Sequence, residues 1–151
     1  MPGETNDNLE VIRDSLPLFK NLSEPQFREL IAESTLHIKD DGDNIFIRND
    51  YSNTLYNIVS GQVMIQLESD QKFYLSASNF FGEMGLISGR RRTASTFAVG
   101  PTVLIETPRK QIQKLISSVE GVSKTIDDTF MFRTLQNFFP GVSPDKVFRI
   151  R

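Results

Sequence analysis

The chain has 151 residues, of which 38% are hydrophobic and 24% are charged, and its formal net charge is −2. This length predicts one domain with a sizeable core, and the slightly acidic balance argues against a nucleic-acid partner. The sequence contains no cysteine, which excludes disulfides, thiolate zinc sites and cysteine nucleophiles. Its apolar runs are too short to cross a membrane and its first residues are polar, so we expect a cytoplasmic protein without a membrane partner.

Helices are predicted at the start of the chain. Apolar side chains at helical spacing before Pro17 predict a first helix over residues 8–15, with an apolar face formed by Leu9, Ile12 and Leu16. Ser23 is placed to cap a second helix, and Gln26, three residues later, completes a capping box. Residues 1–22 are therefore interpreted as a helical lead-in.

From Thr35 the apolar residues alternate with polar ones instead of recurring at helical spacing. Short strands are predicted over residues 35–39, 44–48, 54–59, 62–68, 72–76, 93–99 and 102–106. Turn-forming residues lie between them, among them Ser60-Gly61 and Gly100-Pro101. Asn49 also occupies a turn, and asparagine tolerates positive φ. Many short strands with frequent turns are typical of a small sandwich or barrel.

Helical spacing returns near residue 107. Thr107, which Pro108 follows, is the expected N-cap of a helix that ends near Gly121, and its apolar stripe consists of Ile112, Leu115, Ile116 and Val119. A last helix is expected over residues 123–138, with two apolar faces formed by Val122, Ile126 and Phe130 and by Phe132, Leu135 and Phe139. A helix that is apolar on two sides must bury both. The barrel can cover one face, so we expect the other to meet a second copy of the chain or an output domain.

Residues 81–95 combine glycines, a carboxylate and arginines in a short segment. Gly82 and Gly85 allow a tight turn and a close approach of the backbone to a ligand. A helical turn that begins at Glu83 would present free N–H groups to an anion, and an arginine from residues 90–92 would grip the same anion as a two-pronged donor. The Glu83 carboxylate, which only accepts hydrogen bonds, suits sugar hydroxyls. The segment therefore predicts a cradle for one phosphate with a ribose attached.

This segment resembles the phosphate-binding cassette of the cyclic nucleotide-binding domain family, as found in sensors of the catabolite activator and protein kinase A regulatory subunit type. The family motif runs Phe-Gly-Glu-x-Ala/Gly-Leu and then, after a short spacer, Arg-Ser/Thr/Ala-Ala. Residues 81–86 and 92–94 match it without a gap, and the resemblance extends over residues 16–138. Where the family often has proline before the arginine, this chain has Arg91, which leaves open whether Arg91 or Arg92 faces the phosphate; the register favours Arg92.

The resemblance implies an α+β, mainly β fold: a small antiparallel β-barrel or jelly roll flanked by N-terminal and C-terminal helices. The domain is expected to span residues 23–138, with the cassette at 81–95, C-terminal helices at 107–138, and a tail or linker at 139–151. The ligand residues that the resemblance implies are Gly82, Glu83, Met84, Gly85, Arg92, Thr93 and Ala94. A base pocket is expected from Ile65, Phe73, Phe130 and Met131.

The function that the resemblance implies is a regulatory sensor for a cyclic nucleoside monophosphate. Cyclic AMP is favoured over cyclic GMP, and the signal is expected to leave through the C-terminal helix, as in the sensor part of a larger protein. The alternative is a degenerate barrel that keeps the fold as a protein-interaction module, which the joint presence of Glu83, Arg92 and Thr93 argues against. We expect no enzyme activity, cofactor or metal, because His37 is the only histidine and is interpreted as a structural or surface residue.

Overall fold

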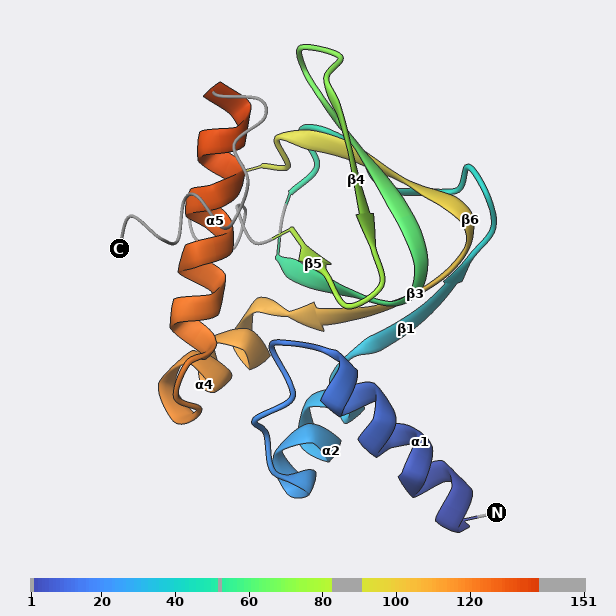
Figure 1. The fold of residues 1–151 in the computed structure, drawn as a ribbon, viewed down its shortest axis with the longest axis vertical. Helices are drawn as coiled ribbons and strands as arrows, with labels where there is room; N and C mark the ends of the chain where they lie inside the picture. Colours follow the sequence, from blue (N-terminus) through green and yellow to red (C-terminus); the bar gives the residue numbers. More distant parts are fainter. Residues whose placement is uncertain (1, 52, 83–90, 139–151) are drawn as a thin grey trace.

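The structure is a computed structural model that describes residues 2–51, 53–82 and 91–138 of the chain. Helices α1 (Pro2–Ser15) and α2 (Glu24–Ala32) come first, and helices α4 (Arg109–Ser118) and α5 (Val122–Phe138) come last. Between them the described strands are β1 (Thr35–Lys39), β2 (Asn44–Phe46), β3 (Thr54–Leu67), β4 (Lys72–Ser76), β5 (Phe80–Phe81) and β6 (Ala94–Pro108). Figure 1 shows the strands curled into a barrel with α1 and α2 at one end and α4 and α5 along one side.

Two long strands, β3 and β6, hold the barrel together by pairing antiparallel along most of their length. The first half of β3 lies between β5 and the second half of β6, and β1 pairs with the outer side of that same half of β6. The second half of β3 lies between β4 and the first half of β6, which also pairs with β2. Both long strands therefore take part in both halves of one six-stranded sheet, which curls into the barrel. The predicted α+β fold with flanking helices is confirmed.

The predicted turns at Ser60-Gly61 and Gly100-Pro101 are wrong, because each long strand continues through them. The register of the β3–β6 ladder shifts on both sides of Ser60, which marks a bulge where the strands bend. Gly61 has φ +91°, and a Cβ there would lie 2.4 Å from the Pro101 carbonyl oxygen, so a side chain cannot be accommodated. The Thr102 hydroxyl donates to the Gln62 carbonyl across the bulge at 3.0 Å. Turn-type residues thus serve here to bend two strands together.

The N-terminal helices have the predicted sequence signals. The capping box at the start of α2 is confirmed, with the Gln26 N–H donating to the Ser23 hydroxyl at 3.3 Å and the Ser23 N–H donating to the Gln26 side chain at 2.8 Å. Helix α1 begins at Pro2, six residues earlier than predicted. Asn49 has φ 80°, a conformation that asparagine tolerates.

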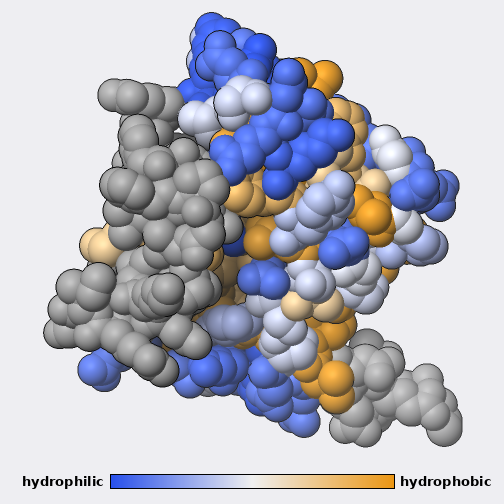
Figure 2. Space-filling model, turned by 45° about the horizontal axis from the view of Figure 1, so that its top comes forward, coloured by the Kyte–Doolittle hydropathy of each residue, from blue (hydrophilic) through white to orange (hydrophobic). Residues whose placement is uncertain are grey.

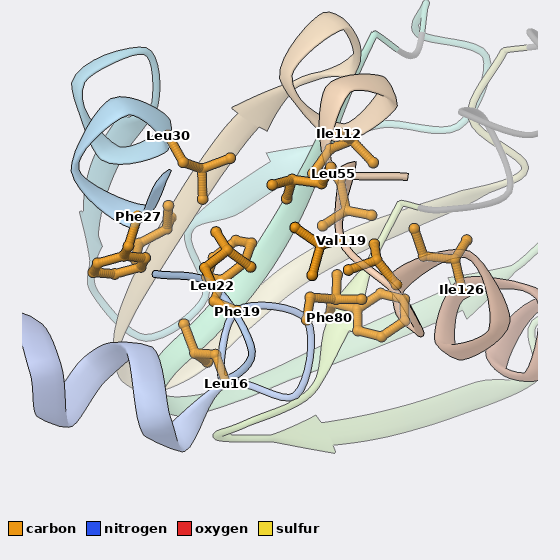
Figure 3. Packing of buried hydrophobic residues seen from close by; sticks show 14 residues of the cluster. Leu16, Phe19, Leu22, Phe27, Leu30, Leu55, Phe80, Ile112, Val119 and Ile126 are labelled. Carbon is orange, nitrogen blue, oxygen red and sulfur yellow. The ribbon is translucent and has the colours of Figure 1, made fainter. Parts of the chain in front are cut away.

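The main hydrophobic cluster joins both ends of the chain to one end of the barrel (Figure 3). Phe19, which has no exposed surface, packs against Phe27 with ring centroids 5.9 Å apart. The other buried members come from the N-terminal helices, strands β3, β5 and β6, and the C-terminal helices: Leu16, Leu18, Leu22, Leu30, Leu55, Phe80, Ile105, Ile112, Leu115, Val119, Val122 and Ile126. Because helices from opposite ends of the chain share this cluster, they are fixed on the barrel together.

The start of α4 differs from the prediction. Pro108 is the N-cap and no side chain caps the helix, whereas Thr107 is the penultimate residue of β6. Thr107 is fully buried, and its hydroxyl oxygen lies 3.0 Å from the Ser34 hydroxyl oxygen. This hydroxyl therefore forms a hydrogen bond inside the packed end of the sheet and does not cap the helix. Of the predicted apolar stripe, Ile112, Leu115 and Val119 are buried, whereas Ile116 has 41% of its surface exposed.

Helix α5 begins at Val122 and runs beside β5 (Figure 1). The guanidinium of Arg133 donates a hydrogen bond to the Phe80 carbonyl and lies over the Phe80 ring, 5.5 Å from its centroid. Val122 and Ile126 are buried in the main cluster and Phe130 is half-buried, as the first predicted apolar face requires. On the second predicted face, Phe132 is half-buried, while the side chains of Leu135 and Phe139 lie outside the described residues.

A second hydrophobic cluster fills the barrel and is rich in aromatic rings. Its core is formed by Tyr56, Ile58, Val63, Phe81 and Leu104. The Tyr56 and Phe81 rings are stacked, with centroids 5.1 Å apart and planes 5° apart. This stack leads directly to Gly82, because Phe81 is the last residue of β5.

The surface of the described residues mixes hydrophilic areas with small hydrophobic patches (Figure 2). On strand β1 two apolar residues are exposed: Leu36 has 62% of its surface exposed and Ile38 has 77%. Within the described ranges, none of the helices combines the length and the apolar character that crossing a bilayer requires.

Candidate functional site

Arg92 lies just before β6 with its side chain directed into the barrel, and only 6% of its surface is exposed. Its Nη1 donates to the Gly82 carbonyl at 3.2 Å, and its Nη2 donates to the Thr54 carbonyl at 3.0 Å and to the Thr54 hydroxyl at 3.2 Å. The guanidinium carbon lies 4.1 Å from the centroid of the Phe46 ring, which is a cation–π contact. A planar, permanently charged group is thus held in a defined orientation beside the start of the cassette.

The close contact with Arg92 explains why a glycine is needed at position 82. Its φ is +90°, and a Cβ added there would lie 2.6 Å from Arg92 Nη1. A larger residue would therefore be strained and would also displace the guanidinium. The close approach that the sequence predicted at Gly82 is, within the described residues, an approach to the arginine.

The backbone of Arg92 is fixed on both sides. Its N–H donates to the Asp50 carbonyl at 2.7 Å, and its carbonyl accepts from the Asn49 N–H at 2.8 Å. The neighbouring Arg91 is exposed and turns outward: its Nη2 donates to the Tyr51 hydroxyl at 2.9 Å, and its guanidinium lies 4.4 Å from the centroid of that ring. The two adjacent arginines therefore lie in different environments, one inside the barrel and one on its surface.

Behind Arg92, the carboxylate of Glu106 accepts hydrogen bonds from side chains of two strands, β1 and β3. His37 Nε2 lies 2.7 Å from one carboxylate oxygen, while the Thr54 and Tyr56 hydroxyls donate to the other at 2.8 Å and 2.9 Å. Burial alone would raise the pKa of Glu106, but the hydrogen bonds from His37, Thr54 and Tyr56, with the charge on His37, hold it below its ordinary value. Burial, the charge of Glu106 and the hydrogen bond to Glu106 raise the pKa of Tyr56 to about 12. The network thus contains an ionised carboxylate beside a neutral phenol.

The remaining predicted ligand residues are only partly described. Thr93 is exposed in the bend before β6, and Ala94 is buried as the first residue of that strand. Glu83, Met84 and Gly85 lie outside the described residues.

The predicted base-pocket residues come from separate parts of the fold. Ile65 of β3 and Phe73 of β4 are directly opposite each other in the ladder, and both are half-buried. Phe130 and Met131 lie on α5, where Phe130 is half-buried and Met131 is 40% exposed. The structure therefore brings the first two together and places the other two on the helix that Arg133 joins to β5.

Sequence reasoning missed the side chains that surround Arg92: Phe46, Thr54, Tyr56 and Glu106. Glu106 lies 52 residues after Thr54 and 50 after Tyr56, and the register of the sheet, in which Tyr56 is opposite Glu106, brings it to them. One signal was available: Glu106 is the one charged residue of strand β6, and a charge that becomes partly buried in a strand needs partners. His37, interpreted from sequence as structural or superficial, supplies one of those partners.

Comparisons with known proteins agree with this geometry. The family model described as "Cyclic nucleotide-binding domain" matches residues 39–119, which is more than half of the 151 residues. A cyclic nucleotide-gated potassium channel of Rhizobium etli is 31% identical over 119 residues, covering 79% of this chain and 33% of the channel. The type II regulatory subunit of cAMP-dependent protein kinase from Drosophila melanogaster is 27% identical over 125 residues, with the same two shares. The chain thus spans about one third of the length of each of these relatives.

Among solved structures, the sensor domain of the transcriptional regulator DNR from Pseudomonas aeruginosa superposes with a TM-score of 0.73 at 23% identity. The superposition covers 93% of this chain and 97% of that domain, so the two share a fold over nearly their whole length. The fold, the cassette sequence and the family match lead to one assignment. The chain belongs to the cyclic nucleotide-binding domain family.

Proposed function

We propose that this chain is a regulatory sensor domain that binds a cyclic nucleoside monophosphate and passes the binding event to its C-terminal helix. The observation that carries the proposal is the inward, fixed guanidinium of Arg92 beside Gly82, at the register of the family's cassette arginine. A planar fork of donors matches the oxygens of a phosphate, and the orientation of the fork is fixed before any ligand arrives. Cyclic AMP is the proposed ligand in preference to cyclic GMP.

In this proposal each cassette residue has one role. Arg92 holds the phosphate, and Gly82 leaves the space that the guanidinium needs. Glu83 accepts from the ribose hydroxyl, the backbone of Met84 and Gly85 adds N–H donors, and the exposed Thr93 hydroxyl adds another donor beside the arginine. Ile65, Phe73, Phe130 and Met131 are proposed to contact the base.

The proposed domain spans residues 23–138, with residues 1–22 as a lead-in and residues 139–151 as a tail or a linker to an output domain. The shared hydrophobic cluster supports the inclusion of the C-terminal helices, because it fixes them to the barrel, and α5 is the last described element. A second copy of the chain or an output domain is the proposed partner of α5.

The test is a binding titration with cyclic AMP and cyclic GMP on the parent, Arg92→Ala and Arg91→Ala. Removing Arg92 deletes charge-assisted hydrogen bonds, so we expect a loss of about 1.5–3 kcal/mol of binding free energy. Arg91→Ala is the matched control, because it deletes an equal charge from the adjacent position on the surface, and its effect should stay within about 0.5 kcal/mol.

Three results would contradict different parts of the proposal. A parent that binds neither nucleotide at millimolar concentration would favour a degenerate barrel that acts as a protein-interaction module. Strong binding that is lost with Arg91→Ala and kept with Arg92→Ala would assign the phosphate to the other arginine. A clear preference for cyclic GMP in competition would reverse the choice of base.

A further inference from the structure

One of the groups that hold the Arg92 guanidinium is the hydroxyl of Thr54. The Thr54 hydroxyl accepts from Arg92 Nη2 at 3.2 Å and donates to a Glu106 carboxylate oxygen at 2.8 Å. A threonine hydroxyl has a single hydrogen to donate, and its lone pairs accept. With the hydrogen committed to Glu106, the lone pairs remain for the guanidinium. Glu106 therefore determines which way the Thr54 hydroxyl points.

The Glu106 carboxylate is itself held in place by hydrogen bonds, and it has no hydrogen of its own to donate to Thr54. Its oxygens accept from His37, Thr54 and Tyr56 at 2.7–2.9 Å, and its pKa lies below the ordinary value. An ionised carboxylate only accepts hydrogen bonds, so the proton of the Thr54 hydroxyl lies on the Thr54 side, directed at Glu106. The charge of Glu106 also offsets part of the cost of burying the charge on Arg92.

The groups behind Arg92 belong to the sheet, not to the loop that carries the arginine. Thr54 begins β3, Glu106 lies near the end of β6, and His37 lies on β1, with β6 paired to both other strands. The Tyr56 ring, one more side chain of this group, lies 5.7 Å from the guanidinium carbon and is stacked on Phe81. The position of the guanidinium is thus set by side chains of the paired strands β1, β3 and β6.

We propose that Thr54 and Glu106 are positioning residues for Arg92: Glu106 orients the Thr54 hydroxyl, and Thr54 fixes the plane in which the guanidinium meets a phosphate. The inference rests on the proposed function, which it deepens, and neither residue is assigned a contact with the ligand. Bidentate recognition requires both N–H groups of the fork to lie in the plane of the phosphate oxygens. A guanidinium free to rotate would lose that geometry while keeping its charge.

The first experiment needs no ligand. Nitrogen-15 NMR of the Arg92 side chain measures rotation about the Nε–Cζ bond, and Arg92→Lys identifies the signal by removing it. We expect slow rotation in the parent and in Thr54→Ser, which keeps the hydroxyl, and faster rotation in Thr54→Val, which keeps the shape. Equal rotation rates in the parent and in Thr54→Val would overturn the positioning role.

The second experiment measures affinity for cyclic AMP and cyclic GMP. Thr54→Val should weaken binding about tenfold, and Thr54→Ser should stay within about twofold of the parent. Glu106→Gln should match Thr54→Val, because the glutamine amide can donate to the Thr54 hydroxyl and turn its hydrogen toward Arg92. Thr107→Val is the matched control: it removes a hydroxyl that is also buried at the end of the sheet but contacts Ser34, and it should leave affinity unchanged.

A double-mutant cycle separates positioning from simple stabilisation of the barrel. If Thr54 acts through Arg92, Thr54→Val should change affinity by less than about twofold in the Arg92→Ala background. An equal loss in both backgrounds, or the same loss from Thr107→Val, would assign Thr54 a structural role only. If the parent binds neither nucleotide, the proposed function fails, and the ligand-free rotation rates still decide whether Thr54 positions Arg92.

Discussion

Arg92 is a buried charge that neutral groups help to hold. Two backbone carbonyls, one hydroxyl and the face of Phe46 contact its guanidinium. The Glu106 carboxylate is linked to the guanidinium through the Thr54 hydroxyl, so an opposite charge lies one hydrogen bond further away. Its negative charge offsets part of the cost of burying the arginine.

The Glu106 carboxylate also links stability to pH. Because its pKa in the folded protein lies below its ordinary value, it stabilises the fold above that ordinary value and loses this contribution as the pH falls through the lower, folded-state pKa. We expect the urea midpoint of the parent to fall between about pH 6 and about pH 3, and the fall to be smaller for Glu106→Gln. Glu29→Gln is the control, since Glu29 forms an exposed pair with Lys114, and it should leave the pH dependence close to that of the parent. Parallel curves for the parent and Glu106→Gln would contradict the role of this carboxylate.

The residues of the site differ in how far sequence could predict them. Gly82 and Arg92, which contact each other in the structure, lie in a short segment that the sequence already marked by its glycines and arginines, and their role toward a ligand stays a prediction. Thr54 and Glu106 were not marked in this way, because their meeting depends on a register between strands separated by a long stretch of chain. Local patterns predict local structure, and this part of the site is assembled by long-range pairing.

At the scale of elements, α5 is joined to the chain immediately before the cassette. Arg133 donates to the Phe80 carbonyl, two residues before Gly82, whose carbonyl accepts from Arg92. A ligand that shifts Gly82 or Arg92 would act on α5 through a short piece of backbone. These contacts therefore offer a physical route for the proposed coupling between the cassette and α5.

Hydrogen exchange tests this route. Cyclic AMP should slow amide exchange in α5 by a larger factor than in the second half of β3, which is already paired on both sides. In Arg133→Met, which removes the donor to Phe80, we expect the ligand-induced slowing in α5 to fall by at least about half, while binding persists. Equal slowing in α5 and β3, or no change in α5 despite measured binding, would show that α5 does not receive the signal.

The elements themselves were mostly predictable, with instructive exceptions. Alternation and helical spacing located the strands and helices, because burial on one face imposes those periods. The sequence could not distinguish a hairpin from a bulge at Ser60-Gly61, since glycine permits both and the choice depends on the partner strand. Thr107 suits an N-cap by type, but its hydroxyl is used inside the packed end of the sheet.

For the whole molecule, the main hydrophobic cluster makes the two ends of the chain one cooperative unit. Side chains from before Thr35 and from after Pro108 pack together over Leu55, Phe80 and Ile105 (Figure 3). Unfolding of the N-terminal helices would therefore expose the apolar face of the C-terminal ones, so neither end is expected to unfold alone.

A substitution in the main hydrophobic cluster tests whether the two ends of the chain unfold as one cooperative unit. Phe19→Ala should lower the free energy of unfolding by about 3–5 kcal/mol, because it removes a fully buried ring from the shared cluster. Urea unfolding followed by circular dichroism and by tyrosine fluorescence should still give one coincident transition. Val11→Ala, at a side chain that is 67% exposed on α1, is the control and should change stability by less than about 0.5 kcal/mol. Separate transitions for helix and barrel in Phe19→Ala would contradict a single unit.

The pairing of β6 has a consequence for how the chain folds as it is synthesised. Strands β1, β2 and β3 all pair with β6, which comes last in sequence among the strands of the described residues. Until residue 108 has left the ribosome, those earlier strands lack the partner that closes the barrel, and only local pairings such as β3 with β4 are available. A nascent chain that stalls before Ala94 would carry unpaired strand edges, which are sites of aggregation. Completion of this one strand therefore allows the barrel to close, and the C-terminal helices must follow before the main hydrophobic cluster is complete.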